Sequence, residues 1–273
     1  MDQTAPQARV CVNLACGPTY VDGWHNLDYN AVPGAVTRAN LLGRLPFADG
    51  SADVLYSSHF LEHVPTDRLP GLLAECHRIL RPGGWLRLCL PDLAAHCRAY
   101  LEMRDGSNDR LAEFVILALI DQCVRLRRGG ALGDFYRGLD NLPAGDRATI
   151  ERYMGAQRPG VSGKRTARDK LRGLELRAER LYCRAVVALL PRAFRQQNVS
   201  FTSVGERHMW MYDHVTLGGK LADAGFTGIT RHRHDSSDIA DFPLKPLDVS
   251  EDGSPRKGEL SMYLEARKAT VER

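Results

Sequence analysis

Short apolar segments that end at glycine, proline or polar residues most constrain the fold of this chain. In the first hundred residues such segments predict strands at 9–15, 25–29, 35–39, 52–57 and 85–90. Between the last two, 66–80 has apolar residues at helical spacing and ends at the breaker Arg81-Pro82-Gly83-Gly84. Strands separated by a helix predict a parallel sheet of the α/β class.

The C-terminal part returns to this pattern. Residues 215–224 predict a helix, and 228–234 and 260–266 predict two strands joined without a helix. Strands joined in that way pair antiparallel, because a parallel pair needs a long crossover connection. We therefore expect a doubly wound, mostly parallel sheet of seven strands whose last strand is antiparallel.

The middle of the chain predicts a basic helical insertion. Residues 111–128 and 170–190 have apolar residues at helical spacing, whereas 156–167 is typical of an exposed loop. Residues 151–200 hold 12 Lys and Arg against 4 acids, in a chain of net charge +4. We predict a ligand-binding domain of residues 1–103 and 206–273, and an insertion of residues 104–205 that serves as lid or substrate element.

The positive charge of the insertion has three interpretations. A solvated charged face is the default. A basic amphipathic helix at 170–190 can also bind an anionic substrate or make peripheral contact with an anionic membrane. Nucleic acid is the least favoured partner, because the segment has few aromatic residues to stack on bases and no recognition motif.

Composition excludes several classes of protein. No apolar run approaches the roughly 18 to 20 residues that span a bilayer, and the N-terminus MDQTAPQARV has no signal-peptide pattern. Seven cysteines without a CxxC pair indicate neither a disulfide framework nor a zinc site. We therefore expect a cytoplasmic protein with reduced thiols and no metal; the oligomeric state is left open.

Residues that follow the predicted strands are the candidate ligand contacts, because ligands bind at the carboxyl ends of such strands. Gly17 allows close backbone approach, Asp28 can accept both hydroxyls of a ribose, and Asn40 can accept from an adenine amino group. The loop ACGPTYVDG lacks both GxGxxG and a lysine, which excludes a dinucleotide site and a P-loop. A nucleoside without phosphates is indicated.

At these residues the chain resembles class I S-adenosylmethionine-dependent methyltransferases, in particular their type 11-like branch. The motifs that carry the resemblance are VNLACGPTYVDGWHNLDY, LPFADGSADVLYSSHFLEHV, ECHRILRPGGWLRLCLPDL, GERHMWMYDHVTLGGKLADAGF and DGSPRKGELSMYLEA. They cover residues 9–100 and 205–268. The resemblance implies the Rossmann-like methyltransferase fold and S-adenosyl-L-methionine as cofactor.

The resemblance also implies roles for the cofactor-binding residues. Ala15 and Gly17 would line the methionine and sulfonium part, Asp28 the ribose, Asn40 and Leu41 the adenine edge, and the Ser57 backbone the amino-acid end. The family usually has Asp in place of Asn40 and Gly in place of Ala15. An amide oxygen can replace the carboxylate, since adenine is neutral. Only ten residues separate Gly17 from Asp28, so we expect a turn there rather than a full helix.

Methyl transfer to a hydroxyl benefits from a general base, for which histidine is the usual choice near neutral pH. His59 and His208 are the catalytic candidates. The structural alternatives are a capping or packing role for His59 and an anchor for the insertion at His208. Glu62 and His63 are expected to begin the next helix.

Three functions remain open on the sequence. O-methylation of a small molecule, sugar or glycan precursor is the first. N-methylation of a metabolite or protein side chain, which needs no strong base, is the second. The third is a non-catalytic module that binds a partner or an anionic membrane through its basic helix. Asn40 and Ala15 favour such a module, whereas Gly17, Asp28 and SSHFLEHV oppose it. Arg256 and Lys257 have two interpretations, a pair that binds an anionic group or a solvated hairpin tip, of which the tip is favoured.

Overall fold

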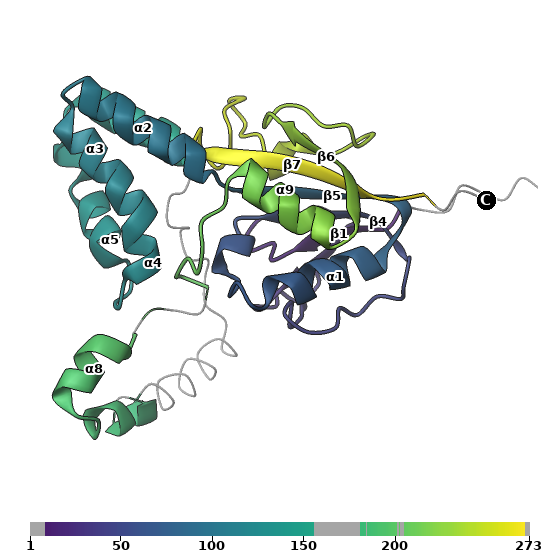
Figure 1. Cartoon of the computed structure of the whole chain (residues 1–273), viewed down its shortest axis with the longest axis horizontal. Helices are drawn as coiled ribbons and strands as arrows, with labels where there is room; N and C mark the ends of the chain where they lie inside the picture. The colour runs from purple at the N-terminus through teal and green to yellow at the C-terminus, as the bar shows by residue number, and fades with distance from the viewer. Residues whose placement is uncertain (1–8, 156–180, 184, 201, 203–204, 271–273) are drawn as a thin grey trace, which may run out of the picture.

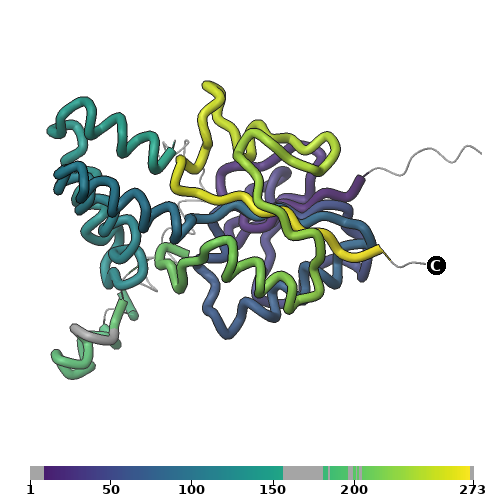
Figure 2. Tube along the Cα trace, turned by 45° about the horizontal axis from the view of Figure 1, so that its top comes forward, coloured from purple at the N-terminus to yellow at the C-terminus, as the bar shows by residue number. Residues whose placement is uncertain are grey.

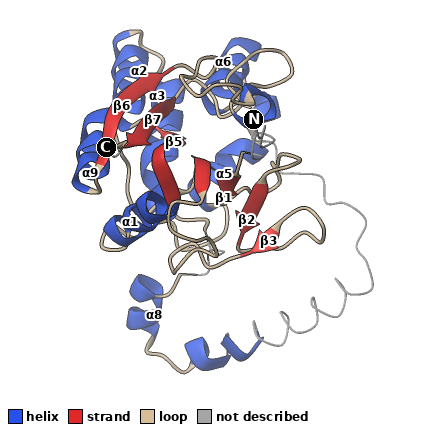
Figure 3. Cartoon of the chain, turned by 90° about the vertical axis from the view of Figure 1, so that its right-hand side faces the viewer, coloured by secondary structure: helices blue, strands red, loops and turns tan. Residues whose placement is uncertain are grey.

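A seven-stranded sheet forms the centre of the computed structural model, which describes residues 9–155, 181–183, 185–200, 202 and 205–270. The strands are β1 (Cys11–Leu14), β2 (His25–Asp28), β3 (Thr37–Arg38), β4 (Ala52–Ser58), β5 (Leu80–Pro91), β6 (Phe226–His232) and β7 (Ser261–Lys268). Their order is β3-β2-β1-β4-β5-β7-β6 (Figure 3). The first five strands are parallel, and β7 is antiparallel to both β5 and β6. The predicted Rossmann-like sheet with its antiparallel last strand is confirmed.

One face of this sheet is apolar and is covered by helices. Leu86, Leu88 and Leu90 of β5 belong to the large buried cluster of this face. Helices α1 (Leu69–Ile79) and α9 (His214–Asp223) lie over it (Figure 1). Both helices were predicted, α1 from its apolar spacing and α9 as a short helix before Gly225. Burial of an apolar face is what holds a short helix in place.

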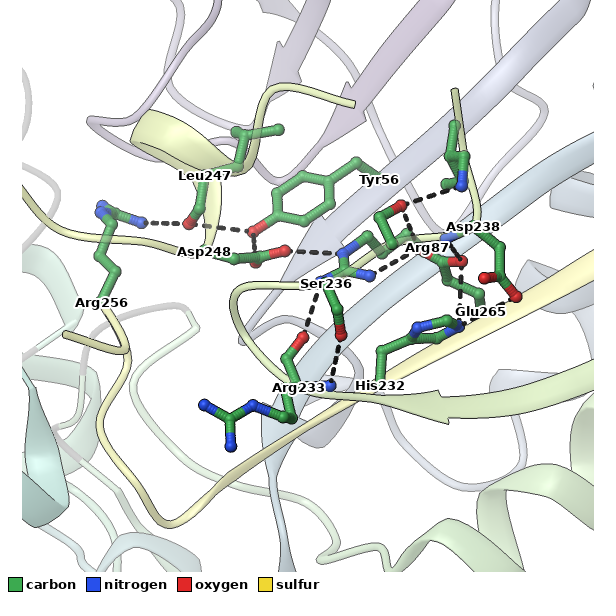
Figure 4. A network of polar contacts seen from close by, with 12 residues as sticks. Tyr56, Arg87, His232, Arg233, Ser236, Asp238, Leu247, Asp248, Arg256 and Glu265 are labelled. Atoms are coloured by element: carbon green, nitrogen blue, oxygen red, sulfur yellow. Dashed lines mark hydrogen bonds and ion pairs between the residues drawn. The ribbon is translucent and has the colours of Figure 1, made fainter. Parts of the chain in front are cut away.

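The opposite face carries a buried charge. Arg87 of β5 is 0% exposed and ion-pairs with Asp248 at 2.7 Å and with Glu265 of β7 at 2.5 Å (Figure 4). Asp248 belongs to the long connection between β6 and β7, just after the short helix α10 (Leu244–Leu247). Since Asp248 also accepts a hydrogen bond from Tyr56 of β4, this connection is held against β4 and β5 by polar contacts.

The link between β1 and β2 contains no helix, as the short spacing predicted. The side chain of Asn26 in β2 forms hydrogen bonds with backbone groups of this link instead. The Asn26 amide donates to the carbonyls of Val21 and Trp24 and accepts from the Val21 N–H. Asn13 of β1 donates to the Asn26 side-chain oxygen at 3.2 Å. Two buried amides thus replace the backbone hydrogen bonds that a crossover helix would have made.

Helices that follow β5 gather beside the carboxyl end of the sheet (Figure 2). They are α2 (Leu93–Asp105), α3 (Asp109–Ile116), the π-helical segment η2 (Leu117–Asp121), α4 (Gln122–Val124), α5 (Gly130–Arg137), the 3-10 turn η3 (Leu139–Asn141) and α6 (Ala144–Met154). The predicted helix at 111–128 is present as the run from α3 to α4. A second apolar cluster around Phe114 and Val115 includes Ala99 of α2, so packing is continuous across the predicted boundary at residue 104.

The predicted loop at 156–167 and most of the predicted basic helix at 170–190 lie outside the described residues, so membrane contact through 170–190 stays a prediction. The short helix α8 (Arg192–Asn198) follows. Within the part of the chain that the structure describes, no helix has the length and apolar character needed to cross a membrane.

Removing the Arg87 cation is expected to destabilise the fold strongly. Arg87→Met leaves Asp248 and Glu265 buried without their partner, which costs about 3 to 5 kcal/mol of the free energy of unfolding. Denaturant titration measures the loss. The control is Arg233→Ala, because the Arg233 guanidinium pairs with Asp235 in an exposed contact that solvent screens, so its loss should change stability little. Equal losses in the two variants would contradict the importance of the buried pair.

Candidate active site

The carboxyl ends of β1, β2 and β4 form one edge of the sheet. Leu14 is in register with Leu27 on one side and with Ser57 on the other. Directly after β1 the chain turns through Ala15 (φ 55°) and Gly17 (φ 54°). A Cβ added to Gly17 would meet no atom within 4 Å, so open space lies beside this turn. The predicted cofactor contacts on these strands therefore share one edge.

Asp28 is the best-defined residue of this edge. Its Oδ2 accepts a hydrogen bond from the Gly17 N–H at 3.0 Å, and its Oδ1 accepts from the Asn30 N–H at 2.8 Å. A carboxylate oxygen has two lone pairs, so each still has one free for a ribose hydroxyl. The structure thus brings Gly17 and Asp28 together in an arrangement that suits a nucleoside.

Asn40, Leu41 and Ser57 lie close to this point. The Ala39 N–H donates to the Asp28 carbonyl at 3.0 Å, which places Asn40 next to the ribose-binding candidate. Asn40 Oδ1 accepts from the Leu42 N–H at 3.2 Å and keeps one lone pair for an adenine amino group. Ser57 Oγ donates to the Leu14 carbonyl at 3.1 Å, so its side chain is used within the sheet. These roles stay predictions.

A cavity of about 290 Å³ adjoins the ends of β4, β5 and β7. The side chains that line it include His59, Glu62, His63, His96, Arg125, His208, Lys257 and Ser261. Both predicted catalytic histidines therefore reach the same cavity, although they lie far apart along the chain.

His59 follows β4 at a positive φ of 50°. Its ring Nε2 lies 3.0 Å from Ser261 Oγ, which itself donates to the Lys257 carbonyl at 2.9 Å. Because that hydroxyl hydrogen is already used, Nε2 is the donor to Ser261, and Nδ1 keeps its lone pair 3.6 Å from Glu62 Oε1. Burial and the nearby cationic groups, Lys257 first, hold the pKa of His59 well below its usual range, so the ring is neutral at pH 7.

Glu62 lies in the 3-10 turn η1 (Leu61–His63), so the expected helix start is a single short turn. Its carboxyl is 1% exposed, and neither oxygen has a hydrogen-bond partner among the described residues. Burial raises the pKa of Glu62 to about 8. His208 is also buried, and desolvation lowers its pKa to about 3, which keeps the ring neutral.

Lys257 corrects the expectation of a solvated hairpin tip. It lines the cavity, and desolvation by burial lowers its pKa. The adjacent Arg256 N–H donates to the Asp248 carbonyl at 2.8 Å, which folds this turn back toward the site. The Arg256 guanidinium also donates to the Leu247 carbonyl at 3.4 Å (Figure 4). The inward position of Lys257 could not be predicted from the sequence, because DGSPRKG has the composition of an exposed turn. The contact that folds the turn back is made with a residue outside this motif.

Comparison with known proteins identifies relatives of part of the chain. Residues 19–88 match a family described as "Methyltransferase domain". A Mycobacterium marinum protein described as "Uncharacterized methyltransferase" is 41% identical over 70 residues, 26% of this chain and 23% of that protein. The chain thus spans less than a quarter of the length of that curated relative.

Two solved structures of S-adenosylmethionine-dependent methyltransferases are similar to most of the chain. The Archaeoglobus fulgidus structure has 11% identity and a TM-score of 0.40, with 95% of this chain and 86% of that chain covered. The Methanosarcina mazei structure has 13% identity and the same TM-score of 0.40, with 95% and 92% covered.

The family match confirms the predicted resemblance to methyltransferases over residues 19–88. That segment carries Asp28, Asn40, Leu41 and Ser57, the predicted cofactor contacts after β2, β3 and β4. The family implies S-adenosylmethionine as cofactor. The open space at Gly17 and the free lone pairs of Asp28 fit its adenosyl group.

Loss of the Asp28 carboxylate is expected to weaken cofactor binding. We expect Asp28→Ala to reduce the affinity for S-adenosylhomocysteine by about tenfold or more, because charge-assisted hydrogen bonds to the ribose disappear. Isothermal titration calorimetry measures the change. Asp22→Ala is the control, since Asp22 is an exposed acid of the same loop. Unchanged affinity in Asp28→Ala would remove Asp28 from the site.

Proposed function

We propose that this protein is an S-adenosylmethionine-dependent methyltransferase that O-methylates a small molecule or a sugar or glycan precursor. The observation that carries the proposal is the position of His59. It stands two residues beyond Ser57 of the cofactor edge, and its ring lines the cavity with a free Nδ1 lone pair. A cofactor edge and a cavity with a neutral imidazole are what transfer to a hydroxyl requires.

The chain's own residues divide the chemistry between them. The bound cofactor supplies a methyl group activated by its sulfonium. His59 Nδ1 accepts the proton of the acceptor hydroxyl, while Ser261 fixes the ring through Nε2. The same Nδ1 nitrogen lies 3.6 Å from the Glu62 carboxyl, which its raised pKa keeps mostly protonated at pH 7. Lys257 reaches the same cavity and can orient an electron-rich acceptor.

N-methylation is the second candidate, and one observation favours it. Desolvation lowers the pKa of Lys257 in the cavity. The same environment would keep an acceptor amine neutral, and only a neutral amine has the lone pair that attacks a methyl group. O-methylation needs a general base to take the proton of the hydroxyl, whereas N-methylation of a neutral amine does not.

Transfer of a labelled methyl group tests the proposal. The protein is incubated with S-adenosylmethionine labelled with tritium in the methyl group. Separate pools of acceptors contain monosaccharides, nucleotide sugars, phenols, and primary or secondary amines. Label in a hydroxyl pool, with loss of label transfer in Asp28→Ala, supports O-methylation. Label in amine pools alone supports the second candidate. Cofactor binding without transfer to any pool would favour the non-catalytic module.

Substitution of His59 separates the two chemistries. We expect His59→Ala to lower kcat for a hydroxyl acceptor by about 10² to 10⁴, the usual contribution of a general base, with unchanged affinity for S-adenosylhomocysteine. His214→Ala is the control, because His214 is an exposed residue at the start of α9. An unchanged kcat in His59→Ala would exclude the base role and favour an amine acceptor.

A further inference from the structure

We infer that Glu62, His63 and His208 form a binding site for a divalent transition metal beside the acceptor cavity. Each of the three side chains offers one donor atom, and these atoms all lie within 4.8 Å of one another. Two imidazoles and one carboxylate are a donor set that binds Zn²⁺ or Fe²⁺. The inference does not depend on the proposed methyl transfer.

The backbone around these residues fixes their relative positions. The Met209 and Trp210 N–H groups donate to the Glu62 carbonyl at 2.6 and 3.2 Å. The His208 N–H donates to the Gln122 carbonyl at 3.0 Å. The segment that carries His208 is therefore bound to η1, so the three donors converge without any rearrangement of the fold.

The carboxyl of Glu62 is the donor that a bound cation would stabilise most. It is 1% exposed and accepts no hydrogen bond from the described residues. By contrast, Glu265 is 0% exposed but accepts hydrogen bonds from Arg87, Ser237 and the Asp238 N–H. A buried carboxylate without such partners is costly, and it is neutralised either by a proton or by a bound cation.

His63 is oriented as metal-binding histidines are. Its Nδ1 lies 2.8 Å from the Arg207 carbonyl, and because a carbonyl can only accept, Nδ1 carries the hydrogen. The lone pair is then on Nε2, which lies 3.8 Å from Glu62 Oε1. A ligating histidine usually donates its other N–H to a backbone carbonyl or carboxylate in this way.

His208 completes the set. Its Nδ1 is buried without a hydrogen-bond partner among the described residues, and its ring meets the His63 ring edge-on at 4.9 Å between centroids. Desolvation keeps this imidazole neutral, which is the form that binds metals. This set of three donors could not be predicted from the sequence, because His208 is distant from the Glu62-His63 pair along the chain.

Two cationic residues face the same cavity and oppose a metal. Arg125 is compensated, since it pairs with Asp121 at 3.0 Å and with Glu206 at 3.6 Å. The pKa of Lys257 is lowered by desolvation, which reduces its tendency to carry charge. A metal held here would stand at the cavity wall near His59, where it could polarise an acceptor oxygen.

Direct metal titration tests the site without any assay of activity. The full chain is stripped with a chelator and titrated with Co²⁺, followed by its visible absorption, and with Zn²⁺ by calorimetry. We expect stoichiometric binding, and a loss of affinity of about tenfold or more in His208→Ala and in Glu62→Gln. Thermal melting and S-adenosylhomocysteine binding establish that each variant is folded.

The second cluster of similar donors supplies the matched control. His232, Asp238 and Glu265 also offer donor atoms within 4.8 Å of one another, but Glu265 is already paired with Arg87. We expect His232→Ala to leave metal binding unchanged. Two results would overturn the inference: no stoichiometric binding by the folded chain, or binding that survives both His208→Ala and Glu62→Gln.

Discussion

The buried ion pair between Arg87 and its two acids determines how the second face of the sheet is covered. An unpaired guanidinium in the centre of a sheet would be strongly unfavourable, so Asp248 must stay where Arg87 can reach it. Asp248 in turn accepts from the Arg256 backbone and directs the next residue, Lys257, into the cavity. The polar contact that holds the fold therefore also positions part of the site.

Two buried glutamates show how this protein separates stability from function. Glu265 is fully hydrogen-bonded and serves the fold, whereas Glu62 is equally buried but lacks hydrogen bonds within the described residues. Costly groups of this kind concentrate at functional sites, where a ligand, proton or metal compensates for them. We infer from this contrast that the proposed chemistry belongs to the end of β4 rather than to the charged network of the opposite face.

Local patterns were enough to predict the sheet, and the predicted cofactor contacts lie along one of its edges. The strand periodicity and the turn at Gly17 depend on neighbouring residues, and Asp28 follows from the end of its strand. The cavity was predicted only in part. His59 and His208 were identified by residue type, but the unpaired state of Glu62 and the inward position of Lys257 depend on contacts between distant segments. Such contacts leave no periodic signal in a single sequence.

The end of β4 connects the cofactor edge to the acceptor cavity. Ser57 belongs to the edge and His59 to the cavity, and two residues of extended chain span roughly 7 Å at most. The positive φ of His59 turns the chain sharply here, at a cost of about 1 to 2 kcal/mol for a residue with a Cβ. The His59 N–H bond to the Cys89 carbonyl, at 2.8 Å, helps to hold this conformation. Such local strain is typical of positions where a side chain must be aimed at a ligand. We infer that the turn keeps donor and acceptor close enough for in-line transfer.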